Sequence, residues 1–290
     1  MQANGAKMNP SKDSTAVLPT PNFDVLADLV QTIGSVSFFR EIGDVIGCIT
    51  PYDNLLFFLY RQDAAPMLLS NTNVDKAFQQ GLENYLDHTY LLNPVYQAFK
   101  SGVTSGAYMM SDLLPDGYGD LIKAVEFRVK IDTRETIGYL TPGWPRHTEE
   151  LLLLVCLPDD AMIEVTILRD YDTGFSKQDF GAMQQIFPVI LAVFCKHWTL
   201  ANQNYTAQPS RPSLDTSFDD FGADVLTDRE KEVVKLVLTG HSSESISLRL
   251  GTSVPTIKSH RRNIYAKLKI GSQAELFSRF IGFLTSRPRS

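Results

Sequence analysis

The end of the chain, from Leu226 to Ser290, carries closely spaced signals for the ends of helices. Two stretches, Thr227-Asp228-Arg229-Glu230 and Ser272-Gln273-Ala274-Glu275, have the form of a capping box, in which the side chains of the first and fourth residues satisfy free backbone amides. Gly240 and Gly251 follow segments of helical apolar spacing, where glycine commonly ends a helix. These signals predict four short helices with a tight turn between the second and the third, which is a helix-turn-helix.

The third of these helices has two contrasting faces. Ser253 is its predicted cap, and Pro255 stands in the first turn, where its missing N–H costs nothing. Three apolar residues recur at spacings of seven and four and so share one face, which must be core: Ile257, Ile264 and Leu268. The opposite face carries small and basic residues: Lys258, Ser259, Arg262 and Ala266. A helix of this kind, predicted over 254–268, can enter a major groove about 12 Å wide, where Arg and Lys donate to guanine.

Charge is divided unevenly along the chain, whose formal net charge is −6. The segment from Leu226 onward holds 12 Lys and Arg against 5 Asp and Glu, a net of +7, which leaves −13 for the preceding residues. Chance segregation of solvated surface charge is one explanation. Such asymmetry is also typical of a nucleic-acid-binding module joined to an acidic domain, and the capping pattern favours that interpretation.

Several short motifs in this basic segment carry a family resemblance over about 60 residues. They are Leu226–Val233 (LTDREKEV), Gly240-His241-Ser242, Thr256–His260 (TIKSH), Asn263-Ile264 and Lys267-Leu268. The segment resembles the DNA-binding domain of LuxR/FixJ/NarL-type regulators. The resemblance implies that Lys258, Ser259 and Arg262 read bases and that Thr256 and Lys267 lie near phosphates. Arg261 belongs to the same basic stretch and completes the predicted DNA-binding set. The chain departs from the family pattern at Ser245, Ser247 and Gln273.

The predicted fourth helix is unusually apolar. It contains Leu276, Phe277, Phe280, Ile281, Phe283 and Leu284. This is more apolar surface than a helix of about 13 residues needs for one core, and the family's fourth helix is its usual dimer contact. We therefore expect a homodimer that binds two half-sites related by two-fold symmetry. The alternative is burial of the whole stripe within one chain.

The remaining chain divides at a polar stretch. Residues 202–224 contain two prolines and lack periodicity, which predicts a linker between a first domain (23–201) and the DNA-binding domain (225–290). Residues 1–22 are polar and punctuated by proline, without the apolar core of a signal peptide, and are expected to be a disordered lead-in. Three widely spaced cysteines form no disulfide framework.

The first domain mixes helical and strand signals. Helical spacing occupies 23–34, 38–47 and 179–200, with Ser176 a plausible cap for the last of these. Short apolar or alternating runs predict strands at 54–61, 67–70, 151–157 and 164–169. The prediction is an α+β domain with helices packed on an antiparallel sheet. It resembles the GAF/PAS-like sensor domains.

One segment of this domain, Tyr85 to Tyr108, resembles the pocket segment of quorum-sensing LuxR regulators, which place a tyrosine some nine residues before an Asp-Pro pair. Here the pair is Asn93-Pro94, so the acidic residue that would bind the amide of an acyl-homoserine lactone is missing, which argues against that ligand class. Aromatic walls with a few polar tips are typical of small-molecule pockets. The pocket candidates are Tyr85, Tyr90, Asn93, Tyr96, Tyr108 and Trp144. Plain core packing is the competing interpretation.

Other functional classes find little support. The histidines are isolated from one another, and the sequence contains no HExxH, GxSxG or phosphate-binding glycine loop. An enzyme is therefore the remote alternative, and no metal site or cofactor is expected. Apolar runs are too short for a membrane span of about 20 residues. The sequence predicts a cytoplasmic, dimeric regulator that binds double-stranded DNA under control of a small molecule. Alternatively, the first domain only dimerises or binds another protein.

Overall fold

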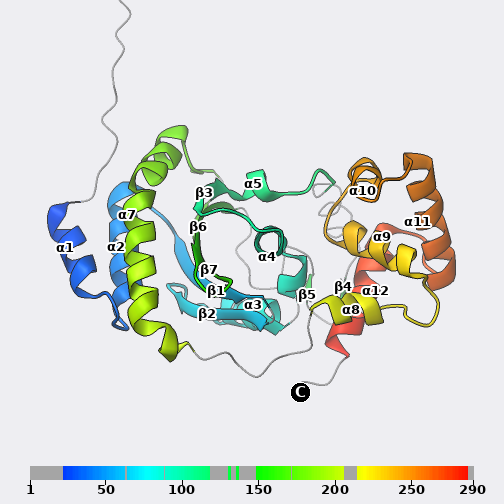
Figure 1. Ribbon diagram of the computed structural model, residues 1–290, viewed down its shortest axis with the longest axis horizontal. Helices are drawn as coiled ribbons and strands as arrows, with labels where there is room; N and C mark the ends of the chain where they lie inside the picture. The colour runs from blue at the N-terminus through cyan, green and yellow to red at the C-terminus, as the bar shows by residue number, and fades with distance from the viewer. Residues whose placement is uncertain are drawn as a thin grey trace, which may run out of the picture.

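The computed structural model describes residues 22–62, 64–87, 89–117, 130–131, 135–136, 148–170, 172–205 and 214–286. Figure 1 shows a sheet-containing domain and a helical domain side by side. The predicted lead-in (1–22, apart from its last residue) and the pocket candidate Trp144 lie outside the described residues.

A five-stranded antiparallel sheet with the order β2-β1-β7-β6-β3 forms the centre of the first domain, within the described residues. Its strands are β1 (Asn54–Arg61), β2 (Ala64–Asn71), β3 (Gly106–Met109), β6 (Thr148–Leu157) and β7 (Ala161–Asp170). A small separate ladder pairs β4 (Lys130–Ile131) with β5 (Glu135–Thr136). The α+β prediction is confirmed, and each predicted strand corresponds to β1, β2, β6 or β7.

Both faces of this sheet are covered, because alternate side chains of each strand enter two different cores. Leu55, Phe57 and Leu59 of β1 pack with the layer of α1 (Phe23–Gln31), α2 (Phe38–Ile49) and α7 (Lys177–Ala201). Leu56, Phe58 and Tyr60 face the other layer. That layer consists of α3 (Lys76–Asp87), the 3₁₀ helix η1 (Thr89–Leu92), α4 (Pro94–Lys100) and α5 (Met110–Leu113). Six consecutive buried residues explain why β1 reads as an unbroken apolar run.

The long helix α7 begins at a capping box. The hydroxyl of Ser176 accepts a hydrogen bond from the Asp179 amide at 3.1 Å, and the Asp179 carboxylate accepts one from the Ser176 amide at 2.9 Å. Contrary to the sequence expectation, the stretch Lys177–Asn204 is long and apolar enough to cross a membrane by length and composition, a test that core helices also pass. Here Met183, Ile190 and Phe194 are buried in the core beneath the sheet.

His197, near the end of α7, joins three separate parts of the first domain. Its Nδ1 accepts a hydrogen bond from the Gly34 amide at 3.0 Å, and its Nε2 lies 2.7 Å from the hydroxyl of Tyr205. The imidazole also stacks on the ring of Phe38 at a centroid distance of 4.0 Å. Burial lowers the pKa of His197 to about 4, so the ring is neutral at physiological pH.

The second domain contains the four helices that the capping signals predict. They are α9 (Asp228–Leu238), α10 (Ser243–Arg249), α11 (Val254–Leu268) and α12 (Gln273–Thr285). The side chains of Thr227, Ser242, Ser253 and Ser272 each accept a hydrogen bond from the amide three residues later. Gly240 and Gly251 have φ values of 91° and 60°, a conformation that glycine adopts without steric cost.

The predicted linker differs from the structure, because it contains the helix α8 (Leu214–Asp220). The ring of Phe218 stacks on Phe280 of α12 at 4.8 Å, and Phe221 meets Phe280 edge-on at 5.2 Å. Two phenylalanines three residues apart in a polar stretch are a weak pattern, so α8 depends on the tertiary core for its stability.

The apolar stripe of α12 is covered within the chain rather than left for a partner. Five of its predicted residues are buried, and Phe283 is partly buried and packs against Phe221. The alternative of burial within one chain therefore describes α12, and the expectation of a free dimer stripe on this helix is wrong.

Candidate nucleic-acid interface

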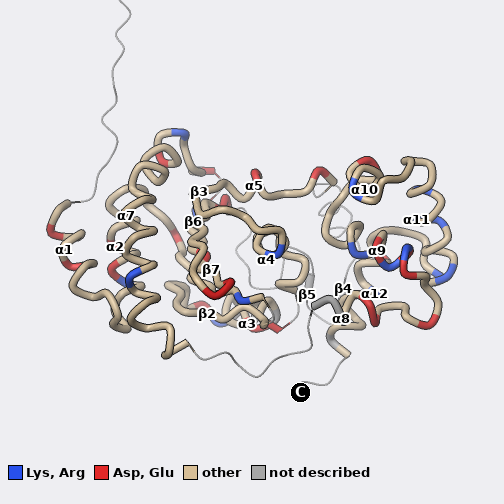
Figure 2. The backbone as a smooth tube through the Cα atoms, viewed as in Figure 1, with Lys and Arg blue, Asp and Glu red and all other residues tan. Residues whose placement is uncertain are grey.

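The helix α11 spans the range predicted for the recognition helix, and its two faces differ as expected. Ile257, Ile264 and Leu268 are buried in the domain core. The opposite side is exposed and carries Thr256, Lys258, Ser259, Arg262, Asn263 and Ala266. Figure 2 shows the basic positions along the outer side of this helix. The packing of the apolar face therefore fixes which side chains point to solvent.

A surface hollow of about 560 Å³ lies beside this exposed face. It is lined by Ser243, Lys258, Arg261, Arg262, Tyr265, Ala266, Ile270 and Gly271. Three cations and a serine from the preceding helix thus share one concave surface. Such a surface suits an anionic, ridged partner such as a duplex backbone.

Arg261 is largely engaged within the protein. Its guanidinium donates to the Ser243 hydroxyl at 3.1 Å, to the Gln273 side-chain oxygen at 2.8 Å and to the Tyr265 hydroxyl at 3.3 Å. These bonds connect α10, α11 and the start of α12. The sequence predicts a DNA contact for Arg261, but this geometry favours a positioning role for the neighbouring helices.

Lys267 is also paired inside the domain. Its Nζ lies 2.6 Å from Oε2 of Glu230, a residue of the capping box of α9. Burial raises the pKa of Glu230, but the hydrogen bonds from Lys267 and Thr227 outweigh it and lower that pKa overall. The ion pair connects α9 to α11 and partly balances the charge of Lys267. Lys258 and Arg262 differ, because no salt bridge to either of them is found in the described residues.

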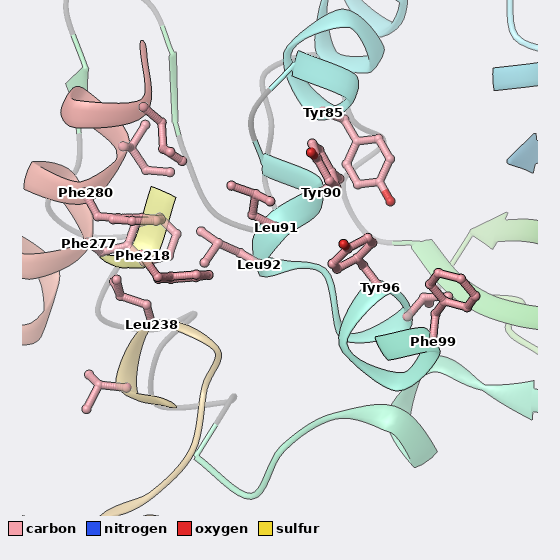
Figure 3. Close-up of a cluster of buried hydrophobic side chains, with 14 of the residues drawn as sticks. Tyr85, Tyr90, Leu91, Leu92, Tyr96, Phe99, Phe218, Leu238, Phe277 and Phe280 are labelled. Atoms are coloured by element: carbon pink, nitrogen blue, oxygen red, sulfur yellow. The ribbon is translucent and has the colours of Figure 1, made fainter. Parts of the chain in front are cut away.

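In the first domain the structure brings together four of the six pocket candidates. Tyr85, Tyr90 and Tyr96 are buried, and Figure 3 shows them on the neighbouring helical segments α3, η1 and α4. The rings of Tyr90 and Tyr96 meet edge-on at 5.3 Å. Asn93 caps α4 through the Val95 amide and donates to the Tyr85 hydroxyl at 3.1 Å.

Tyr108 is partly buried and packs against the same apolar cluster as Tyr85, Tyr90 and Tyr96. It sits on the edge strand β3, and its hydroxyl donates to the Thr104 carbonyl oxygen at 2.9 Å. The hydroxyl therefore bonds back to the adjoining loop. Trp144, the sixth candidate, is not among the described residues.

A buried carboxyl group that the sequence did not single out completes the polar part of this cluster. Oε2 of Glu164 accepts a hydrogen bond from the Tyr60 hydroxyl at 2.5 Å, and Oε1 accepts one from the Thr166 hydroxyl at 2.6 Å. The hydroxyls of Tyr60 and Tyr85 are 2.7 Å apart, so the chain of bonds reaches Asn93. Alternation along β7 places Glu164 on the same face as Met162 and Leu168, a signal that could have marked it as buried.

Burial determines the ionisation of this network. It raises the pKa of Glu164 to about 7, although the hydrogen bonds from Thr166 and Tyr60 act in the opposite direction. Burial also raises the pKa of Tyr60 and of Tyr85 well above the usual value, with the nearby Glu164 adding to it. Glu164 thus changes charge close to neutral pH inside the core.

Comparisons with known proteins agree with the geometry of the second domain. Residues 224–280 match the family model described as bacterial regulatory proteins, luxR family. A protein of Aeromonas salmonicida described as an HTH-type transcriptional regulator in the exeN 3′ region is 30% identical over 183 residues, covering 60% of this chain and 91% of that protein. The monoamine regulon transcriptional regulator of Klebsiella aerogenes is 43% identical over 55 residues, covering 19% of this chain and 24% of its own length.

The chain is also similar to solved structures. The ligand-binding domain of VqsR from Pseudomonas aeruginosa has 16% identity and a TM-score of 0.47, covering 62% of this chain and 97% of that chain. Escherichia coli SdiA has 14% identity and a TM-score of 0.41, covering 90% and 97%. Family membership follows from the sequence matches. The chain belongs to the LuxR family of bacterial regulatory proteins, which are DNA-binding transcriptional regulators of the helix-turn-helix type.

Proposed function

We propose that this protein is a dimeric transcriptional regulator of the cytoplasm in which α11 reads the major groove and the first domain (23–201) responds to a small molecule. The DNA-binding part is 225–290, and residues 202–224, including α8, join the two. The observation that carries the proposal is the exposed face of α11, with Lys258, Ser259 and Arg262 opposite a fully buried apolar face.

The chemistry of this face suits direct readout. Lys258 and Arg262 are four residues apart, so their side chains project from the same side of the helix. Arg and Lys donate to the O6 and N7 atoms of guanine, and the small Ala266 lets the helix approach the bases closely. The exposed cation Lys269 follows the helix and suits contact with a phosphate.

The cluster of Tyr85, Tyr90, Asn93 and Tyr96 supports ligand sensing by the first domain. Its aromatic rings and convergent polar tips have the composition of a small-molecule site. Glu164 adds a group that accepts hydrogen bonds when ionised and donates one when protonated. A ligand that binds one conformation of this cluster would shift the balance of conformations.

Exposed apolar side chains on α1 and α7 support a dimer. Phe23 and Val30 of α1 are 86% and 58% exposed, and Val189 and Leu200 of α7 are 42% and 58% exposed. We assign these exposed positions on α1 and α7 to contacts with a second copy of the chain, since the stripe on α12 is already covered. Replacing Val189 and Leu200 with glutamate should then convert a dimer to a monomer in analytical ultracentrifugation, whereas an unchanged dimer would place the interface elsewhere.

The direct test is selection of genomic fragments by the purified protein and by a Lys258→Ala/Arg262→Ala variant at two salt concentrations. We expect a two-fold-symmetric site that only the wild type recovers. Identical fragments from both proteins would mean that α11 does not read bases.

The alternative role of the first domain is dimerisation or protein binding without a ligand. Because a ligand that binds only the folded state stabilises it by mass action, a small-molecule effector should raise the melting temperature of the full chain with concentration. A flat response across a broad metabolite panel would favour the alternative.

A further inference from the structure

A loop of the first domain contacts the turn that begins the helix-turn-helix. After α5 the chain extends toward α10, as Figure 1 shows, and ends its described course at Asp116 and Gly117. Oδ1 of Asp116 accepts a hydrogen bond from the Ser242 amide at 3.1 Å, and Oδ2 accepts a second from the Ser242 hydroxyl. One carboxylate therefore binds both donors of a residue 126 positions away in the chain.

Gly117 makes this contact close. A Cβ atom at this position would lie 2.7 Å from the Ser242 backbone nitrogen and 2.8 Å from the Gly240 carbonyl oxygen. Both neighbours are backbone atoms, which cannot rotate aside. A side chain at position 117 would therefore displace this loop from the turn before α10.

Apolar residues join the domains at a second place. Leu91 and Leu92 of η1 belong to the same buried cluster as Phe218, Leu238 and Phe277 of the second domain. Figure 3 shows the two leucines between the tyrosines of the first domain and the phenylalanines of α8 and α12. The same η1–α4 layer carries Tyr90, Asn93 and Tyr96 of the proposed ligand cluster. A movement of this layer would therefore also shift Leu91 and Leu92 against the second domain.

The position of Ser242 gives the contact a functional meaning. In a helix-turn-helix bound to DNA, the helix before the recognition helix crosses the DNA backbone. Serine hydroxyls and backbone amides are common donors to phosphates in such interfaces. The next residue, Ser243, lines the basic hollow together with Lys258 and Arg262. Ser242 thus lies at the edge of the DNA-binding face, with its amide and hydroxyl in use.

We propose that Asp116 substitutes for a DNA phosphate: docked on Ser242, its carboxylate competes with the backbone of the operator and holds the protein in a closed form of low DNA affinity. This inference rests on the proposed DNA-binding role of the α11 face. Asp116 is ionised, because burial acts to raise its pKa but the hydrogen bonds from Ser242 outweigh it and lower that pKa overall. Its negative charge therefore repels phosphates at the same place where it removes their donors.

The test compares three full-length variants for binding of a labelled pool of genomic duplexes by fluorescence anisotropy at one salt concentration. Asp116→Asn removes the charge, and Gly117→Ala displaces the loop from the turn before α10 sterically. Asp44→Asn is the matched control: it makes the same change of net charge at an exposed site on α2, in the far layer of the first domain. Small-angle X-ray scattering of the same samples without DNA reports the separation of the domains independently of DNA binding.

We expect Asp116→Asn and Gly117→Ala to bind DNA about 5- to 20-fold more tightly than the control, in the range of ordinary coupling between sites. Both should also have a larger radius of gyration than wild type. Affinities equal to that of the control, with unchanged circular dichroism, would overturn the proposal, as would an unchanged radius of gyration.

A fourth protein separates failure of this inference from failure of the DNA-binding role. Asp116→Asn combined with Lys258→Ala and Arg262→Ala should lose the gain in affinity. If this protein binds as tightly as Asp116→Asn alone, the assigned DNA-binding face is wrong. The proposed competition between Asp116 and DNA phosphates for Ser242 is then wrong as well. Expanded variants without any gain in affinity would show a docking contact that does not compete with DNA, which also overturns the proposal.

Discussion

Glu164→Gln should remove a pH dependence of stability that comes from the buried carboxyl group on β7. The pKa of Glu164 is about 7 in the folded protein, against 4.5 for the unperturbed side chain. Below pH 4.5 the group is protonated in both states. As the pH rises from 4.5 to 7, the unfolded chain loses this proton first, so the free energy of unfolding falls and then levels off. The difference in pKa corresponds to at most about 3 kcal/mol.

Glutamine is the appropriate replacement because it resembles the protonated acid in shape and in hydrogen bonding. Tyr60 and Thr166 can reorient their hydroxyls to match the amide, as they must for the neutral carboxyl group. We therefore expect the variant to be more stable than wild type by about 2–3 kcal/mol at pH 8 and nearly equal to it at pH 4.5.

The assay is urea denaturation at several pH values between 4.5 and 8, read as the difference between wild type and variant. Taking the difference cancels the contribution of His197, which has the opposite sign. Glu244→Gln, at an exposed position on α10, is the control and should show no such difference. A wild-type-minus-variant difference that does not change with pH would refute the assigned burial and pKa of Glu164.

Three further results are expected. Phe218→Ala should lower the free energy of unfolding by about 3–4 kcal/mol in urea denaturation, since the ring is buried against Phe280. A loss below about 1 kcal/mol would mean that α8 does not pack stably on the second domain. Arg262→Ala should weaken specific DNA binding by about 1–3 kcal/mol per half-site and relax base preference at one position, measured by binding-site selection, whereas an equal loss for all sequences would indicate a phosphate contact. The pKa of His197 is about 4 in the folded state and near 6.5 when unfolded, so its contribution to the free energy of unfolding should be fully present above pH 6.5 and be lost as the pH drops toward 4, by about 1–3 kcal/mol. In thermal melts, His197→Gln should reduce this dependence of stability on pH. An unchanged pH dependence in the variant would contradict the lowered pKa of His197.

The polar cluster of the first domain explains why sequence alone identified part of the candidate site. Tyr85, Tyr90, Asn93 and Tyr96 lie within 12 residues of one another on neighbouring short helices, so a local pattern contains all of them. Glu164 and Tyr60 come from two strands that are adjacent only because β1 pairs with β7. No local pattern marks that pairing.

The same distinction applies to the DNA-binding face. The buried and exposed sides of α11 follow from helical spacing, so the sequence alone is enough to place Lys258 and Arg262 on the solvent side. Whether a cation on that helix is free depends on other helices. Arg261 bonds to Ser243 and Gln273, and Lys267 to Glu230, and these partners are set by how α9, α10 and α12 pack on α11.

The helix-turn-helix, its caps and turns, and the α+β class of the first domain could all be predicted from the sequence. Each of these depends on hydrogen bonds and apolar spacings between residues a few positions apart, which a linear pattern records. Three other features depend on the folded arrangement: the helix α8, the covering of α12, and the contact of Asp116 with Ser242. Such contacts join residues tens to more than a hundred positions apart, and their stability comes from the packing of whole elements rather than from any local signal.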